Sequence, residues 1–174
     1  MKATRFPLLV VACGLLSAAS CSDPPPRPDA ANEPTQSSGL LGPLLGPSGL
    51  LSCTQAADSV TQVVGTAGGT IEVGPHQLEI PANALDSNVA ITAVAPSGNV
   101  NVVFFEPHGL EFSESATLTL SYSNCNLLGL LLPKQIAYTS ATLGILSYLT
   151  SIDDLQAQEV RTNLDHFSGY AVAW

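Results

Sequence analysis

The sequence predicts an all-β fold, an antiparallel β-sandwich, over residues 60–174. Apolar and polar residues alternate in short runs such as "ATLTLSY", in which Leu118, Leu120 and Tyr122 would face a core. Turn-forming residues recur between the runs, as in Gly68-Gly69 and Ser97-Gly98-Asn99. Many short strands with regular turn signals are typical of an antiparallel sandwich or barrel.

The runs that predict strands follow one another from Val60 to the last residue. We expect strands at 70–73, 76–80, 88–95, 99–105, 116–122, 134–140, 144–150, 157–163 and 169–174. Between the first two, the pair Gly74-Pro75 predicts a turn. A short helix is expected near "SIDDLQAQ", residues 151–158, where Ser151 would cap a first turn that contains two Asp residues.

The N-terminal residues have the layout of a secretory signal peptide. Lys2 and Arg5 precede an apolar run over residues 8–16, and small residues follow. This run is too short to span a bilayer as a helix of the mature protein. We therefore expect residues 1–20 to be removed and the mature chain to begin at Cys21.

The stretch "SAASCS" resembles a bacterial lipobox, whose Cys becomes the first mature residue and carries lipid. The resemblance implies that Cys21 is lipidated and that the protein is held in the cell envelope through a lipid anchor. Ser22 follows, whereas Asp would favour inner-membrane retention, so the resemblance points to the outer membrane if the host is Gram-negative. The alternative is an ordinary signal peptide cut nearby, which would leave a soluble secreted protein.

Residues 21–59 predict a disordered linker. Its first half is rich in Pro and Ser and suits a tether from a membrane anchor. Its second half, "GLLGPLLGPSGLLSC", is apolar, and Gly and Pro at this density prevent a stable helix. This half would either pack loosely on the domain or bind a partner or a membrane surface. We favour loose packing, because no periodicity supports an amphipathic helix.

Charge excludes one class of partner. The full chain of 174 residues carries a net charge of −9, which becomes −11 when Lys2 and Arg5 leave with the signal peptide. An acidic surface repels phosphate backbones, so we expect no nucleic-acid partner.

The cysteines predict one disulfide. Cys13 lies in the discarded apolar run and Cys21 would take the lipid, which leaves Cys53 and Cys125. Two remaining thiols in an oxidising compartment favour a bond between them. Two free thiols, or pairing between molecules, are the alternatives.

Conventional catalysis has little support in the sequence. His76, His108 and His166 are scattered, no cluster has metal-ligand spacing, and no Gly-x-Ser-x-Gly motif occurs. We therefore expect neither a metal nor a cofactor. A carbohydrate-binding adhesin ranks low, because such a module usually shows exposed aromatics and the chain has one Trp.

Two stretches, "GGTIEVGPHQLEIPANAL" and "FEPHGLEFSESATLTLSY", resemble the ZU-five domain, a β-sandwich module of ankyrins, zonula occludens proteins and netrin receptors. The matching positions are Gly68-Gly69, Ile80-Pro81 and Ala84-Leu85 in the first stretch, and Pro107, Gly109 and Phe112 in the second. The resemblance covers residues 60–174 and implies a module that binds a protein partner, which it does not identify.

The ending "NLDHFSGYAVAW" contains the triplet His166-Phe167-Ser168. In some ZU-five relatives such a triplet cuts its own backbone between Phe and Ser. The resemblance implies a mechanism in which the Ser168 hydroxyl attacks the Phe167 carbonyl, with His166 as base, and water hydrolyses the resulting ester. The alternative, which we favour, is that all three residues are scaffold.

The sequence as a whole therefore predicts a lipid-anchored, non-enzymatic module for protein interaction or envelope architecture. A self-cleaving domain and a carbohydrate-binding adhesin are the alternatives.

Overall fold

The computed structural model describes residues 49–126 and 132–174, whose regular structure is β-strand. The expected signal peptide, Cys21 and the linker up to Ser48 lie outside these residues. Thirteen strands follow in order: β1 (Ser52–Gln55), β2 (Asp58–Val64), β3 (Gly69–Val73), β4 (His76–Ile80), β5 (Val89–Ala95), β6 (Gly98–Val100), β7 (Val102–Glu106), β8 (Glu111–Ser121), β9 (Gln135–Thr139), β10 (Ile145–Leu149), β11 (Ile152–Asp154), β12 (Glu159–His166) and β13 (Gly169–Ala173).

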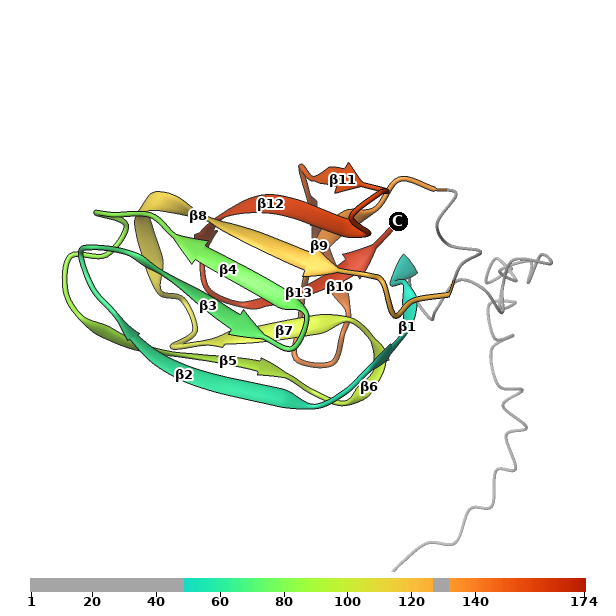
Figure 1. Cartoon of the computed structure of the whole chain (residues 1–174), viewed down its shortest axis with the longest axis horizontal. Coiled ribbons are helices and arrows are strands. Elements are labelled where there is room, and N and C mark those ends of the chain that lie inside the picture. The colour runs from blue at the N-terminus through green and yellow to red at the C-terminus, as the bar shows by residue number, and fades with distance from the viewer. Residues whose placement is uncertain (1–48, 127–131) are drawn as a thin grey trace, which may run out of the picture. The chain divides into compact units, whose positions relative to one another are not determined.

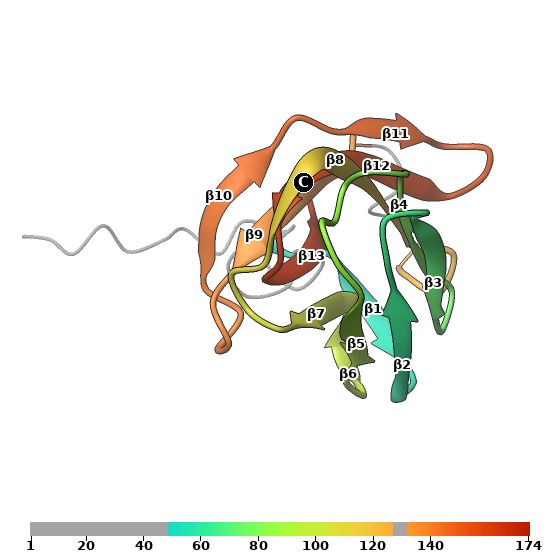
Figure 2. The same cartoon turned by 90° about the vertical axis from the view of Figure 1, so that its left-hand side faces the viewer.

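Two large antiparallel sheets pack together (Figures 1 and 2). One has six strands in the order β10-β9-β13-β7-β5-β2, and the other has five in the order β11-β12-β8-β4-β3. A small pair, β1-β6, adds a third sheet. The all-β prediction is thus confirmed, and the expected strands are present, except that the one expected at 99–105 is divided at Asn101 into β6 and β7 of different sheets.

The core lies between the two large sheets, and alternate residues of each strand supply its side chains. In β8, for example, Ala116, Leu118 and Leu120 are fully buried, whereas Thr117 and Thr119 point away from the core. β12 and β4 follow the same rule, so the outer face of the five-stranded sheet is polar.

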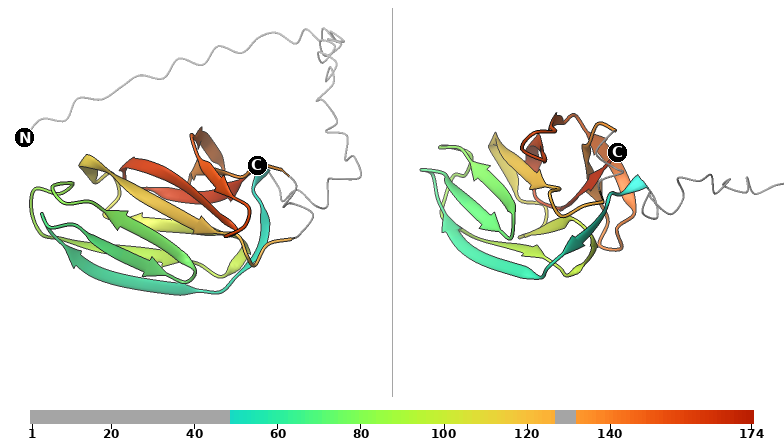
Figure 3. Two further views of the ribbon diagram at one scale, coloured as in Figure 1. Left: turned by 45° about the horizontal axis from the view of Figure 1, so that its top comes forward. Right: turned by 45° about the vertical axis from the view of Figure 1, so that its right-hand side comes forward.

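The six-stranded sheet is apolar on both faces around β13. Successive residues of β13 contribute to different clusters: Tyr170 and Val172 face the main core, and Ala171 and Ala173 face the opposite side. On that outer side Leu50, which is 1% exposed, covers the alanines. Figure 3 shows the C-terminus beside the start of β1, where the Leu51 amide donates to the Val172 carbonyl at 2.9 Å.

The expected helix over residues 151–158 is wrong. The segment forms β11 and a turn into β12. Ser151 does not cap a helix, because its hydroxyl accepts the Ile136 amide at 2.9 Å and donates to the Leu149 carbonyl at 2.8 Å. Asp154 accepts the amides of Gln156 and Ala157, which closes the turn instead of starting a helix.

The folded part begins earlier than the expected boundary at residue 60. β1 and the first residues of β2 lie in the segment that we assigned to the linker. Leu51 is fully buried and β2 pairs along its length with β5, from Asp58 with Ala95 to Val64 with Val89. The short β1 lacks a long alternating pattern, so its strand pairing was not visible in the sequence.

Candidate functional site

The His166-Phe167-Ser168 triplet lies at the crossing from β12 to β13. Phe167 is 1% exposed and its ring stacks on Phe105 at 5.2 Å between centroids, with Phe112 edge-on at 4.9 Å. A buried aromatic that contacts two others contributes strongly to packing. Phe167 is therefore a core residue, as the scaffold interpretation requires.

The turn after β7 holds the backbone of the triplet. The Phe167 amide donates to the Leu110 carbonyl at 2.8 Å, and the Gly109 amide donates to the Phe167 carbonyl at 3.1 Å. The Ser168 carbonyl accepts the Phe105 amide at 3.0 Å. The structure thus brings together two motifs that are far apart in the sequence, "FEPHGLEF" and "HFS".

His166 is half-buried beside the Phe167 carbonyl. Its Nδ1 lies 3.4 Å from that oxygen and 3.5 Å from the Tyr170 hydroxyl, which donates to the His166 carbonyl at 2.7 Å. Burial raises the pKa of Tyr170, which keeps its hydroxyl protonated as a donor. Within the described residues no hydrogen bond joins the His166 ring to the Ser168 hydroxyl. A general base must contact the hydroxyl that it activates, so His166 is not positioned here to remove the Ser168 proton.

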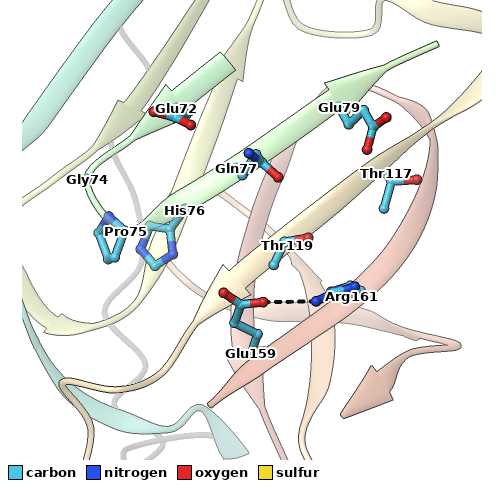
Figure 4. A pocket seen from close by; sticks show the side chains of 10 residues that line it. All are labelled: Glu72, Gly74, Pro75, His76, Gln77, Glu79, Thr117, Thr119, Glu159 and Arg161. Carbon is cyan, nitrogen blue, oxygen red and sulfur yellow. Dashed lines mark hydrogen bonds and ion pairs between the residues drawn. The ribbon is translucent and has the colours of Figure 1, made fainter. Parts of the chain in front are cut away.

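The outer face of the five-stranded sheet contains a second arrangement, which sequence reasoning missed. A straight cross-strand row runs over all five strands: Glu72 pairs with Gln77, Gln77 with Thr119, Thr119 with Arg161, and Arg161 with Ile152. Figure 4 shows the side chains of the first four residues on one surface. The row is acidic at the β3 end and apolar at the β11 end.

Two shallow depressions follow this row. The first, of about 380 Å³, is lined by carboxylates, hydroxyls and amides from β3, β4, β8 and β12, including Glu72, Glu79 and Glu159. The second, of about 500 Å³, is lined by Leu149 and Ile152 among others. Thr117 and Arg161 line both, so the two depressions are continuous, and we call them together the outer groove.

The outer groove has an excess of negative charge. Arg161 forms an ion pair with Glu159 at 3.1 Å, and both side chains are partly exposed. Glu72 and Glu79 have no such partner among the ion pairs of the described residues. No aromatic residue lines the outer groove, so it lacks the stacking surface that sugar rings usually use.

The disulfide that the sequence predicted is confirmed. Cys53 of β1 is bonded to Cys125, which lies in the turn after β8. A buried polar network surrounds it: Asn101, fully buried, donates to the Ser121 carbonyl at 2.8 Å and to the Asn124 side chain at 2.6 Å. Asn124 in turn donates to the Thr54 carbonyl at 2.6 Å, which holds β1 a second time.

His76 belongs to the same end of the domain and is 1% exposed. Its Nδ1 accepts the Ser121 amide at 3.2 Å, which leaves Nε2 to donate to Gln55 Oε1 at 3.2 Å. Gln55 also accepts the Val102 amide at 3.0 Å. Burial lowers the pKa of His76 to about 4, so the ring is neutral in the folded protein.

Other site classes can be checked within the described part of the chain. No group of three or more His, Cys, Asp or Glu residues there is placed to hold a metal ion. No helix in residues 49–126 or 132–174 is long and apolar enough to cross a membrane. No protein-family model matches the chain, and no curated protein matches it.

The sequence therefore located the triplet and the disulfide but not the outer groove. The alternating polar positions of "TIEV", "HQLEI" and "ATLTLSY" signalled a solvated face, yet they did not show that the three strands are neighbours.

Proposed function

We propose that the chain is a lipid-anchored module displayed outside the cytoplasm, and that its domain, a ZU-five-like β-sandwich, binds a protein partner in the outer groove. The partner would present an extended segment with both basic and apolar side chains. The observation that carries this proposal is the row from Glu72 to Ile152, which offers a carboxylate at one end and an exposed apolar side chain at the other.

Charge supports a basic partner segment. In the described residues Lys134 and Arg161 are the Lys and Arg side chains, and Lys134 is buried, with Nζ donating to the Leu132 carbonyl and lying over the Trp174 ring. Arg161 is paired with Glu159. The unpaired carboxylates of the groove would therefore attract a cationic segment within about 10 Å at moderate ionic strength.

Membrane attachment rests on the sequence. The signal-peptide layout and "SAASCS" support lipidation at Cys21, and the Pro- and Ser-rich stretch after it supports a tether. The two ZU-five-like stretches support a role in protein interaction over one in catalysis.

A photo-cross-linking residue in place of Thr119 tests the proposal in intact cells. We expect a protein cross-link whose partner peptide contains Lys or Arg next to apolar residues. The double variant Glu72→Gln, Glu79→Gln is expected to reduce its yield about 5-fold, since each lost charge contact is worth up to about 1 kcal/mol. Mass spectrometry of the cross-linked peptides identifies the segment.

The same cross-linker at Thr61, an exposed Thr of the other sheet, is the matched control and is expected to give no such product. An equal yield from Thr61, a glycan product from Thr119, or no effect of the two Glu changes would contradict the proposal. Cys21→Ala tests the anchor separately, because it is expected to abolish labelling of the protein by palmitate.

Self-cleavage is a second candidate, which one observation favours. The Phe167 carbonyl oxygen accepts the Gly109 amide at 3.1 Å, so this amide is placed to stabilise negative charge on that oxygen, and His166 Nδ1 lies 3.4 Å from the same atom. Attack by the Ser168 hydroxyl would replace the peptide bond with an ester to Phe167 and free the Ser168 amine. Water would then hydrolyse the ester and leave residues 168–174 as a separate strand. The ladders of β13 with β7 and β9 would still hold that strand.

Intact mass under denaturing conditions tests this candidate. Self-cleavage is expected to give a product that lacks residues 168–174 and that disappears in Ser168→Ala. A single full-length mass after long incubation at neutral pH would contradict it and leave the triplet as scaffold.

A further inference from the structure

The linker repeats one short apolar unit three times. A Leu-Leu pair follows Gly or Gly-Pro at Leu40–Leu41, Leu44–Leu45 and Leu50–Leu51. The third pair lies within the described residues, so its position shows what this unit does when it meets the domain.

The third pair is docked and buried. Leu51 is fully buried in the main core. Leu50 is 1% exposed and packs with Ala137, Ala171 and Ala173 on the outer face of the six-stranded sheet. One leucine of this pair, Leu50, therefore packs on the outer face of the sheet, while the other enters the main core.

This outer face continues onto β10. Among the described residues, β10 is the edge strand of the six-stranded sheet and has β9 as its one strand partner (Figure 2). Leu146 is 58% exposed and Tyr148 is 50% exposed, and residues 145–149 contain no charge. Tyr148 pairs with Ala137, one of the residues that Leu50 covers. An open, apolar and uncharged edge of this kind is usually covered in native proteins.

The chain enters the described part of the structure next to this edge. Gly49 lies so close to β10 that a Cβ there would be 3.0 Å from the Tyr148 hydroxyl and 3.5 Å from Ile145 Cδ1. Leu45 precedes Gly49 by four residues, so an extended chain places the two at most about 14 Å apart. The five residues of β10 span about 17 Å. The second Leu-Leu pair is thus within reach of Tyr148 and Leu146.

We infer that residues 39–48 of this chain dock along β10 and cover Tyr148 and Leu146, with the Leu44–Leu45 pair as the main contact. The segment is uncharged from Pro34 to Ala57, so it approaches the acidic domain without repulsion. Because it is tethered at Gly49, its effective concentration at the edge is in the millimolar range. A second copy would instead bring a domain of the same charge sign.

The contact would be made mainly by side chains. Pro43 and Pro47 have no amide hydrogen, so the segment cannot form an unbroken ladder with β10. The docked segment would shield the edge from other strands, and it would shorten the free tether to the residues before Gly39.

A photo-cross-linking residue in place of Tyr148 tests the inference in the mature chain with Cys21→Ala. We expect an intramolecular cross-link to residues 39–48 whose yield does not change with protein concentration. The variant Leu44→Ser, Leu45→Ser is expected to lower this yield about 10-fold. The matched control is the same cross-linker at Val63, which is 65% exposed on the opposite edge strand β2 and is expected not to react with residues 39–48.

Three results would overturn the inference: cross-linked dimers that increase with concentration, products with phospholipid vesicles alone, or no product at residues 39–48. The test is independent of the proposed function. Thr119 lies on β8 of the five-stranded sheet, whereas Leu149 at the far end of the outer groove is the one residue of β10 that lines it, so cross-linking from Thr119 succeeds or fails regardless of the result at Tyr148.

Discussion

Removal of the Cys53–Cys125 disulfide is expected to lower the free energy of unfolding by about 4 kcal/mol. The bond joins residues that are 72 positions apart, and in the chain-entropy model a loop of this length gives about that value. In the described residues β1 forms an irregular ladder with β6 and hydrogen bonds with Asn124 and Asn126, and these contacts would remain when the bond is removed. Urea unfolding of Cys53→Ser, Cys125→Ser, followed by fluorescence of the single Trp174, measures the change.

Reductant provides the control for this prediction. It is expected to destabilise the natural sequence by the same amount and to leave the double variant unchanged. Domains of this size have about 5–15 kcal/mol of stability, so the loss is a large share. Equal unfolding midpoints with and without the bond would show that the polar network of Asn101 and Asn124 is sufficient to hold β1.

Acidification from pH 6.5 to 4 is expected to lower the free energy of unfolding by about 3 kcal/mol through His76 alone. Its Nδ1 accepts the Ser121 amide, so a proton on Nδ1 would face that N–H and break the bond. Burial lowers the pKa of His76 to about 4, against 6.5 for an unperturbed His. Between these values the unfolded chain binds a proton that the folded chain does not, so stability is lost as the pH falls.

Urea unfolding at pH 7, 5.5 and 4 measures this loss. His76→Gln is expected to have a lower free energy of unfolding at pH 7, because the network with Ser121 and Gln55 is altered. Its free energy of unfolding is also expected to fall less between pH 7 and 4, because the group that takes up the proton is gone. His108→Gln is the control, since the His108 side chain is 59% exposed and forms an ion pair with Glu106 at the surface. The same pH dependence in His76→Gln and in the natural sequence would assign the acid sensitivity to other groups.

The strand pattern of this domain was predictable because it is local. Leu118 and Leu120 alternate with Thr117 and Thr119 within one strand, and a strand must place such residues on opposite faces whatever its neighbours are. The pairing of Cys53 with Cys125 was predictable for another reason: Cys13 was expected to leave with a signal peptide and Cys21 to carry lipid, which left two cysteines for one bond. The helix at 151–158 was wrong because Ser151 bonds to Ile136 and because residues 152–154 pair with β12, and neither partner lies in the segment itself.

The triplet was visible as a motif, but its chemistry was not. The sequence shows His166 next to Phe167, whereas the contacts that decide its role come from Gly109, Leu110 and Phe105, which are more than fifty positions away.

The outer groove shows most clearly which features a sequence determines and which need the tertiary structure. Alternation in the sequence determined that Glu72, Gln77, Thr119 and Arg161 would point to solvent. Only the tertiary structure placed them in one row with Ile152, because that row depends on the order and register of five strands drawn from residues 69–166. Order and register are set by how the buried faces pack between the sheets, which is a property of the whole domain and not of any one strand.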